Sequence, residues 1–291
     1  MSSRGFTLIE LLIAAAVVIT ISGALAAMVR PLGSVIDRAH FSADMEAGTR
    51  AAIQQLAADL RLAGSDAGVA PPSARLSRVV PPVALLRDLA GGEVGLPATA
   101  MRITFIPHLA AQGTLDLAAG VGDTLLHLDT TTRCALGFPS CGFRPGQHAL
   151  LYSNAAASVV TIDATANGVV TLGSPLSGSF PAGAVLAEFV AVTYGTRPRP
   201  DGSHQLVRIS TGGAEQPVLD HVVAFTVTTD TGDPLDAGRV SWRLRVQAPS
   251  TAFRGPAGSL FHQAGTATHS RDLIPDLEHR MAVALRNRGG L

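Results

Sequence analysis

The first sixty residues show two successive patterns of apolar and polar positions. From Phe6 to Val29 most positions are apolar, and the only ionisable side chain in this run is that of Glu10. These 24 residues, as a helix rising about 1.5 Å each, would reach roughly 36 Å, which exceeds the roughly 30 Å of a hydrocarbon core. The pattern therefore predicts a membrane-spanning helix over residues 6–29.

The segment that follows, residues 30–63, is amphipathic. Its apolar positions recur at helical spacing, namely Leu32, Val35, Ile36, Ala39, Met45, Ala52, Ile53, Leu56 and Leu60. Charged residues, with Asp59 and Arg61 as the last two, are expected on the other sides of the helix. Gly64 is the first strong stop signal. We therefore expect the helix to continue to residue 63 and to pack on a soluble body.

Beyond the helix the pattern changes to that of a β protein. Residues 64–100 contain two Pro-Pro pairs and a Gly-Gly pair, which predict a loop-rich connection. Short β-type runs then alternate with turns: Met101–Ile106, Thr124–Leu128, Ala149–Tyr152, Val159–Ile162, Val169–Leu172, Val185–Tyr194, Gln205–Ser210, Val222–Thr228 and Val240–Val246. Asn167-Gly168 predicts a hairpin turn. Residues 280–288 fit a helix by propensity or a strand by the alternation of Met281, Val283 and Leu285, and we favour the strand. The expected fold class is α+β, a long N-terminal helix packed on an antiparallel β-rich body over residues 101–291.

The composition excludes or disfavours several classes of function. The 22 Lys and Arg residues balance 22 acidic ones, which argues against nucleic acid as a partner. All 22 cations are arginines, so chemistry that needs a lysine, such as a Walker A loop or a Schiff base, is excluded. Neither Gly-x-Ser-x-Gly nor His-Glu-x-x-His occurs. We therefore expect a protein that is not an enzyme and has no cofactor.

The start of the apolar run carries a specific motif. Residues 4–13 read Arg-Gly-Phe-Thr-Leu-Ile-Glu-Leu-Leu-Ile. This resembles the cleavage and methylation motif of type IV prepilins. The resemblance implies that a prepilin peptidase removes residues 1–5 as a leader, cutting between Gly5 and Phe6, and that Phe6 is then N-methylated. It also implies that Glu10 pairs with the N-terminus of a neighbouring subunit and so registers the two helices.

An ordinary secretory signal is the alternative reading of the same segment. Ala24-Leu25-Ala26 would serve as its small-x-small cleavage site. However, the apolar run is long for a signal peptide, and a carboxylate at membrane depth costs about 2.5–3.5 kcal/mol on insertion scales. A disposable signal has little reason to keep Glu10.

A second resemblance concerns the subfamily. The residues from Asp59 to Gly64, Asp-Leu-Arg-Leu-Ala-Gly, are similar to the helix end of PilW-like minor pilins, as Leu285–Arg288 is to their last strand. This implies a minor pilin held in the inner membrane by one span, with a periplasmic body that reaches the cell surface in the pilus. Its implied partners are major and minor pilins, the prepilin peptidase, the inner-membrane assembly platform and the lipid bilayer. A J-like pseudopilin of type II secretion is the rival; a membrane-tethered periplasmic enzyme or ligand-binding β domain is a third alternative.

Cys134 and Cys141 are the only cysteines. If the body lies outside the cytoplasm, we expect them to form a disulfide. Because His127 and His148 extend the same spacing of seven residues, a zinc site is an alternative, although structural zinc sites usually have cysteines two to four residues apart. Free thiols remain a third possibility.

Other candidate chemistry is sparse. Acidic residues that would suit calcium, or simply cap turns, occur at two places: Asp163 with Asn167, and Asp230, Asp233 and Asp236. The segment around Trp242 alternates apolar residues with arginines, which predicts a strand with one apolar and one basic face. We interpret Trp242 as a core residue, with contact to another pilin as the alternative.

Overall fold

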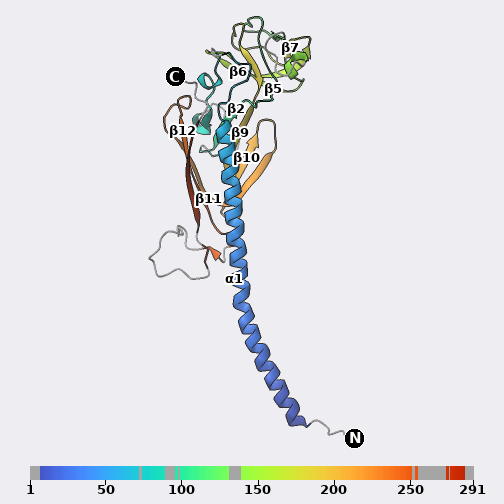
Figure 1. Cartoon of the computed structure of the whole chain (residues 1–291), viewed down its shortest axis with the longest axis vertical. Coiled ribbons are helices and arrows are strands. Elements are labelled where there is room, and N and C mark those ends of the chain that lie inside the picture. Colours follow the sequence, from blue (N-terminus) through green and yellow to red (C-terminus); the bar gives the residue numbers. More distant parts are fainter. Residues whose placement is uncertain are drawn as a thin grey trace. The chain divides into compact units, whose positions relative to one another are not determined.

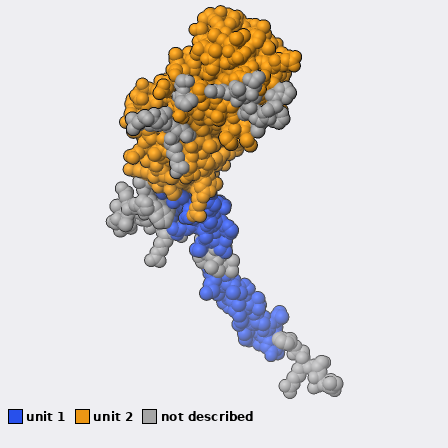
Figure 2. Space-filling model, turned by 45° about the horizontal axis from the view of Figure 1, so that its top comes forward, with its two compact units in different colours: residues 1–47, 247–277 blue, residues 48–246, 278–291 orange. Residues whose placement is uncertain are grey.

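The computed structural model describes residues 7–71, 74–88, 96–97, 99–130, 139–250, 253–254, 273–274 and 276–285, and the side chains of 29–32, 34 and 139 lie outside the description. The chain divides into two compact units, which Figure 2 colours separately. Unit 1 comprises residues 1–47 and 247–277, and unit 2 comprises residues 48–246 and 278–291.

One long helix, α1 (Leu8–Leu62), begins in unit 1 and ends in unit 2. It corresponds to the helix expected over residues 6–63, with slightly shorter bounds. It ends where the sequence predicts, because Gly64 has a φ of 69° and its amide donates a 2.8 Å hydrogen bond to the carbonyl of Thr104. Within unit 1 the rings of Phe41 and Phe253 lie 5.5 Å apart, and Ile274 bonds to the backbone of Phe253.

Unit 2 contains a seven-stranded sheet in the order β1-β2-β9-β10-β11-β12-β13, and the pairings from β1 to β12 are antiparallel. Its strands are β1 (Val83–Leu85), β2 (Met101–Phe105), β9 (Val190–Pro198), β10 (His204–Ser210), β11 (Glu215–Thr229), β12 (Arg239–Val246) and β13 (Leu277–Ala284). Short 3-10 turns occur at Leu76–Arg78, Leu86–Asp88 and Pro139–Gly142.

The C-terminal part of α1 belongs to the same unit as this sheet and lies beside it in Figure 1. Leu56 and Leu60 are 1% and 0% exposed, which explains the amphipathic spacing of this segment. The helix approaches β11 closely at Gly48, where an added Cβ would lie 3.3 Å from Leu219 Cδ1. A larger residue at position 48 would therefore require the Leu219 side chain to shift slightly.

A second sheet is inserted between β2 and β9, in the order β3-β8-β5-β6-β7-β4. Its strands are β3 (Gln112–Thr114), β4 (Leu125–His127), β5 (His148–Tyr152), β6 (Ala157–Ala166), β7 (Val169–Leu172) and β8 (Val185–Glu188). A bridge between Leu115 and Leu128 joins the extensions of the two edge strands. The sheet thus closes on itself around its own apolar cluster, and we call residues 112–188 the inserted barrel.

The expected single strand Val185–Tyr194 is wrong: it is two strands, β8 in the barrel and β9 in the larger sheet. The chain crosses between the sheets at Phe189, which packs against buried residues of another apolar cluster. Apolar residues are frequent on both sides of the junction, and Glu188 is the single charged residue of the run, so composition does not mark the break.

Two short strands, β1 and β3, were not expected, whereas the predicted hairpin at Asn167-Gly168 is present between β6 and β7. The φ values of these two residues, 46° and 81°, are those of a tight two-residue turn. The expected final strand Arg280–Arg288 is shifted, because β13 ends at Ala284; residues 286–288 lie outside the described residues.

Candidate functional site

Among the described residues, the first part of α1 carries the most exposed apolar surface. Residues Leu8–Met28 have a mean hydropathy of 2.5, and none of this stretch is buried within the chain. Leu8, Ile19 and Met28 each remain more than 70% exposed. A helix of 21 residues with this surface is long and apolar enough to cross a membrane.

Glu10 lies in the first turn of this helix and forms a capping box with Thr7. The Thr7 amide and hydroxyl donate hydrogen bonds of 2.9 and 3.0 Å to Glu10 Oε2, and the Glu10 amide donates a 3.4 Å bond to Thr7 Oγ1. Both donors use the same carboxylate oxygen. Among the described residues, no hydrogen-bond donor contacts Glu10 Oε1, so half of the carboxylate is available to another group.

The scissile bond and the methylation site expected from the sequence, Gly5 and Phe6, lie outside the described residues. The described geometry therefore covers Glu10 only.

At the other end of α1, Asp59 connects the helix to the seven-stranded sheet. Its Oδ2 accepts a 2.7 Å hydrogen bond from the Tyr194 hydroxyl on β9 and a 2.9 Å bond from Arg208 Nε on β10. Burial and the neighbouring Asp59 carboxylate raise the pKa of Tyr194, so this tyrosine stays a donor. The side chains of Arg208 and Asp59 are only 17% and 12% exposed.

This corrects the expectation that Asp59 lies on the solvent side of the helix. The residues from Asp59 to Gly64 have different positions in the fold. Asp59 and Leu60 are buried in unit 2, Arg61 is exposed, and Gly64 ends the helix. Amphipathic spacing alone classes an aspartate as a surface residue, and the two donors come from strands more than 130 positions later.

A second carboxylate follows the helix. Asp66 Oδ1 accepts hydrogen bonds from the Leu76 amide at 2.8 Å and from the Tyr152 hydroxyl at 3.0 Å. Desolvation raises the pKa of Asp66, and these two hydrogen bonds offset part of that effect. The chain has only two tyrosines, and both donate to an aspartate at this end of α1, one from each sheet.

Cys141 is 1% exposed and is disulfide-bonded. Cys134 lies outside the described residues, so the pairing of these two cysteines stays a prediction. An added Cβ at Gly113 would lie 2.8 Å from Cys141 Sγ, which makes glycine necessary beside this sulfur.

None of the metal sites considered from the sequence is assembled among the described residues. In the part of the chain that the structure describes, no group of three His, Cys, Asp or Glu side chains converges. His148 Nδ1 is 3.1 Å from the Thr161 hydroxyl. Asp230 and Asp233 accept the amides of Gly238 and Leu235, each at 2.9 Å, which is the turn-capping role.

The strand around Trp242 has the expected two faces. Trp242 is 2% exposed among the buried residues of β12, and Arg243 on the opposite face bonds to Glu278 on β13 at 2.7 Å. This confirms the core position of Trp242. Within the basic face, Arg243 is 43% exposed and forms an ion pair with Glu278.

Comparison of the chain with models of known protein families, and with curated proteins, finds no match.

Proposed function

We propose that this chain is a minor pilin, a non-enzymatic subunit that takes part in the assembly of a type IV pilus. In this proposal residues 1–5 are removed, Phe6 becomes the methylated N-terminus, and the apolar half of α1 holds the subunit in the inner membrane before assembly. Unit 2 lies in the periplasm and later on the filament.

One observation carries the proposal: a wholly exposed apolar helix contains a single acid, Glu10, near its start and continues without a break into a folded β unit. A simple anchor needs the apolar surface, and it gains from the acid only the cap at the start of its own helix. A stacking helix needs both, because the apolar surface supplies van der Waals packing and the acid supplies register.

The geometry of Glu10 suits this role. Its Oε2 satisfies the helix start of its own chain through Thr7, and its Oε1 has no donor among the described residues. The α-amine that cleavage would create on a neighbouring subunit is a suitable donor. An amine and a carboxylate are each costly in lipid, and pairing offsets part of both penalties.

The experiment compares Glu10→Leu with Glu46→Gln, a change at an exposed glutamate on the same helix outside the apolar stretch. Membranes and sheared filaments from cells producing each variant are blotted for the protein. We expect Glu10→Leu to be inserted in the membrane as well as the unaltered chain but to be absent from filaments, and Glu46→Gln to be present in both. Filaments that contain Glu10→Leu at normal levels would refute the pairing.

A type II secretion pseudopilin would use the same helix in the same way. Deletion of the gene separates the two assemblies, because loss of twitching supports the pilus and loss of protein export supports the secretion system.

A further inference from the structure

The seven-stranded sheet ends at β13, and in the part of the chain that the structure describes no strand lies beyond it. The amide of Leu285 donates a 2.9 Å hydrogen bond to the carbonyl of Gly238, which directly precedes β12. The two strands are therefore antiparallel, and the odd-numbered residues of β13 direct their backbone groups toward β12. The alternate residues direct their amides and carbonyls away from the sheet, namely Glu278, Arg280, Ala282 and Ala284. A row of this kind is a template for a further strand.

The side chains beside this edge form a basic cluster. Glu278 Oε2 accepts a 2.7 Å hydrogen bond from Arg243 Nη2 on β12, and its Oε1 accepts a 2.6 Å bond from Arg280 Nε. Two guanidiniums with about ten N–H donors thus share one carboxylate with about four acceptor sites. Arg243 Nε is buried without a hydrogen-bond partner among the described residues, although buried N–H groups are normally paired. The cluster therefore has donors left for a second carboxylate.

The same two arginines line a hollow of about 430 Å³ next to the edge. No acidic side chain lines this hollow. Hydroxyl groups come from three residues of β11 and β12, namely Thr226, Thr228 and Ser241. Arg280 is 72% exposed, and the small side chain of Ala282 is exposed beside it, so a side chain of an added strand has room here.

We propose that β13 binds an extended acidic segment of another protein, which adds to the sheet as a further strand and places a carboxylate in this hollow. Backbone hydrogen bonds along Glu278–Ala284 supply affinity that is independent of sequence. The carboxylate beside Arg243 and Arg280 supplies specificity, because charge-assisted hydrogen bonds are stronger than neutral ones.

Charge favours a partner protein over segments of this chain. Residues 286–291, which follow β13, read Arg-Asn-Arg-Gly-Gly-Leu and include no acidic side chain. Laid along the edge, they would add positive charge to the basic cluster. The β13 strand of a second copy would bring one acid, Glu278, and that carboxylate is already engaged by two arginines.

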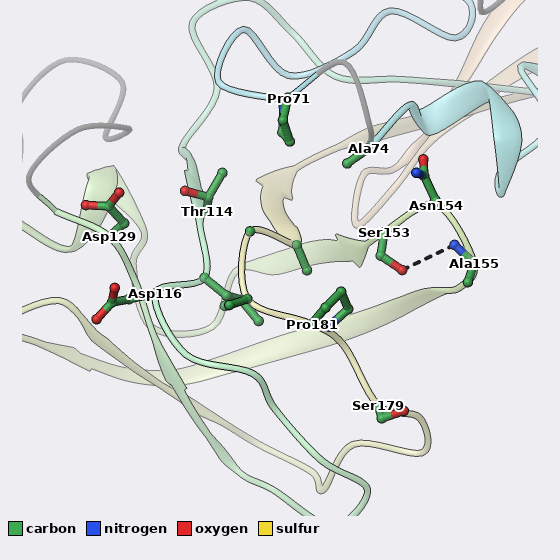
Figure 3. A pocket seen from close by; sticks show the side chains of 14 residues that line it. Pro71, Ala74, Thr114, Asp116, Asp129, Ser153, Asn154, Ala155, Ser179 and Pro181 are labelled. Carbon is green, nitrogen blue, oxygen red and sulfur yellow. Dashed lines mark hydrogen bonds between the residues drawn. The ribbon is translucent and has the colours of Figure 1, made fainter.

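Another hollow, of about 700 Å³ on the outside of the inserted barrel, has the opposite charge. Figure 3 shows the carboxylates of Asp116 and Asp129 on one side of it. The described residues that line it include these two acids and no basic side chain. An acidic segment is therefore not expected to bind there.

The test uses the full chain in an uncharged detergent and a fluorescent heptapeptide in which threonine and glutamate alternate. Fluorescence anisotropy measures binding, and a peptide with glutamine in place of glutamate is the neutral control. We expect the glutamate peptide to bind about tenfold more tightly than the glutamine peptide. Equal affinity of the two would overturn the proposal.

N-methylated peptides separate strand addition from simple attraction between charges. One version of the glutamate peptide carries N-methyl groups on its glutamates, and another carries them on its threonines. Because only every second amide of an added strand faces its neighbour, one version should lose binding and the other should keep it. Equal binding of the two versions would show that no strand is added and would overturn the proposal.

Variants locate the binding. Arg280→Gln should weaken binding of the glutamate peptide about tenfold. Ala282→Pro should weaken it at least as much, because it removes an amide that faces away from the sheet, a position where edge strands tolerate proline. The control is Arg87→Gln, which changes a 58% exposed arginine next to β1, at the other edge of the sheet, and should leave binding unchanged.

Thermal unfolding followed by Trp242 fluorescence shows which variants are folded. Full binding by folded Ala282→Pro would overturn the proposal. So would equal losses of binding from Arg280→Gln and Arg87→Gln, because the peptide would then follow the overall charge of the protein rather than the edge at β13.

Discussion

Replacement of Asp59 by asparagine tests how α1 is held to the seven-stranded sheet. The change keeps the shape of the side chain but leaves the Arg208 guanidinium, 17% exposed, without its 2.9 Å partner. Breaking a buried ion pair by removing one partner costs about 3–5 kcal/mol. Because Arg208 and Asp59 retain some contact with water, we expect the lower end of this range, about 3 kcal/mol of unfolding free energy.

The single tryptophan provides the assay. Trp242 is 2% exposed on β12, in the same sheet as Tyr194 and Arg208, so its fluorescence reports the unfolding of that sheet. For a unit of this size, about 3 kcal/mol lowers the midpoint of thermal unfolding by roughly 6–12 °C. Denaturant titration, followed at the same wavelength, gives the free energy independently.

The matched control is Asp220→Asn. Its ion pair with Arg199 is shorter, at 2.6 Å, but the two side chains are 48% and 38% exposed. A surface pair of this kind contributes about 0–1 kcal/mol. Equal losses from Asp59→Asn and Asp220→Asn would refute the reasoning that burial, not distance, decides the strength. In an Arg208→Met background, Asp59→Asn should cost much less than in the unaltered chain.

Three further predictions follow from the same structure. Asp66→Asn keeps the acceptor oxygen and removes a carboxyl group whose pKa is raised by burial, so the variant should be at least as stable as the unaltered chain at pH 7. As the pH falls through the raised pKa toward 3.8, the folded unaltered chain takes up a proton before the unfolded chain does, so its stability should rise relative to that of the variant. A relative loss of stability on acidification would contradict this. Gly113→Ala should destabilise the barrel by about 1–3 kcal/mol in denaturant titration, because its Cβ would lie 2.8 Å from Cys141 Sγ, whereas Gly120→Ala, whose nearest neighbour is at 3.6 Å, should be tolerated. Mass spectrometry of unreduced peptides should find Cys134 joined to Cys141; this eight-residue loop contributes about 2.5 kcal/mol, and alkylation of both thiols without reduction would exclude the bridge.

Local patterns in the sequence were sufficient for the local elements. The apolar run and Gly64 predicted the extent of α1, Asn167-Gly168 predicted its hairpin, and the alternation around Trp242 predicted the buried face of β12. Each depends on residues within a few positions of one another. The backbone preferences of such residues, and the burial of one face of a helix or strand, produce a periodic pattern in the sequence.

The features that depend on distant residues were missed. Asp59 was assigned to the helix surface because its donors, Tyr194 and Arg208, leave no signal near it. The apolar residues on both sides of Phe189 hid the change of sheet there, since core strands of different sheets have similar compositions. Closure of the barrel depends on the bridge between Leu115 and Leu128, which only the register of six strands brings together.

The central claim is that the apolar half of α1 stays on the mature protein and stacks with other helices. N-terminal sequencing and intact mass measurement of the protein extracted from membranes test it most directly. The account predicts a chain that begins at Phe6 with one added methyl group on its amine. A mature chain that begins near Ala27 would contradict it, because the helix that carries Glu10 would then be absent from the functional molecule.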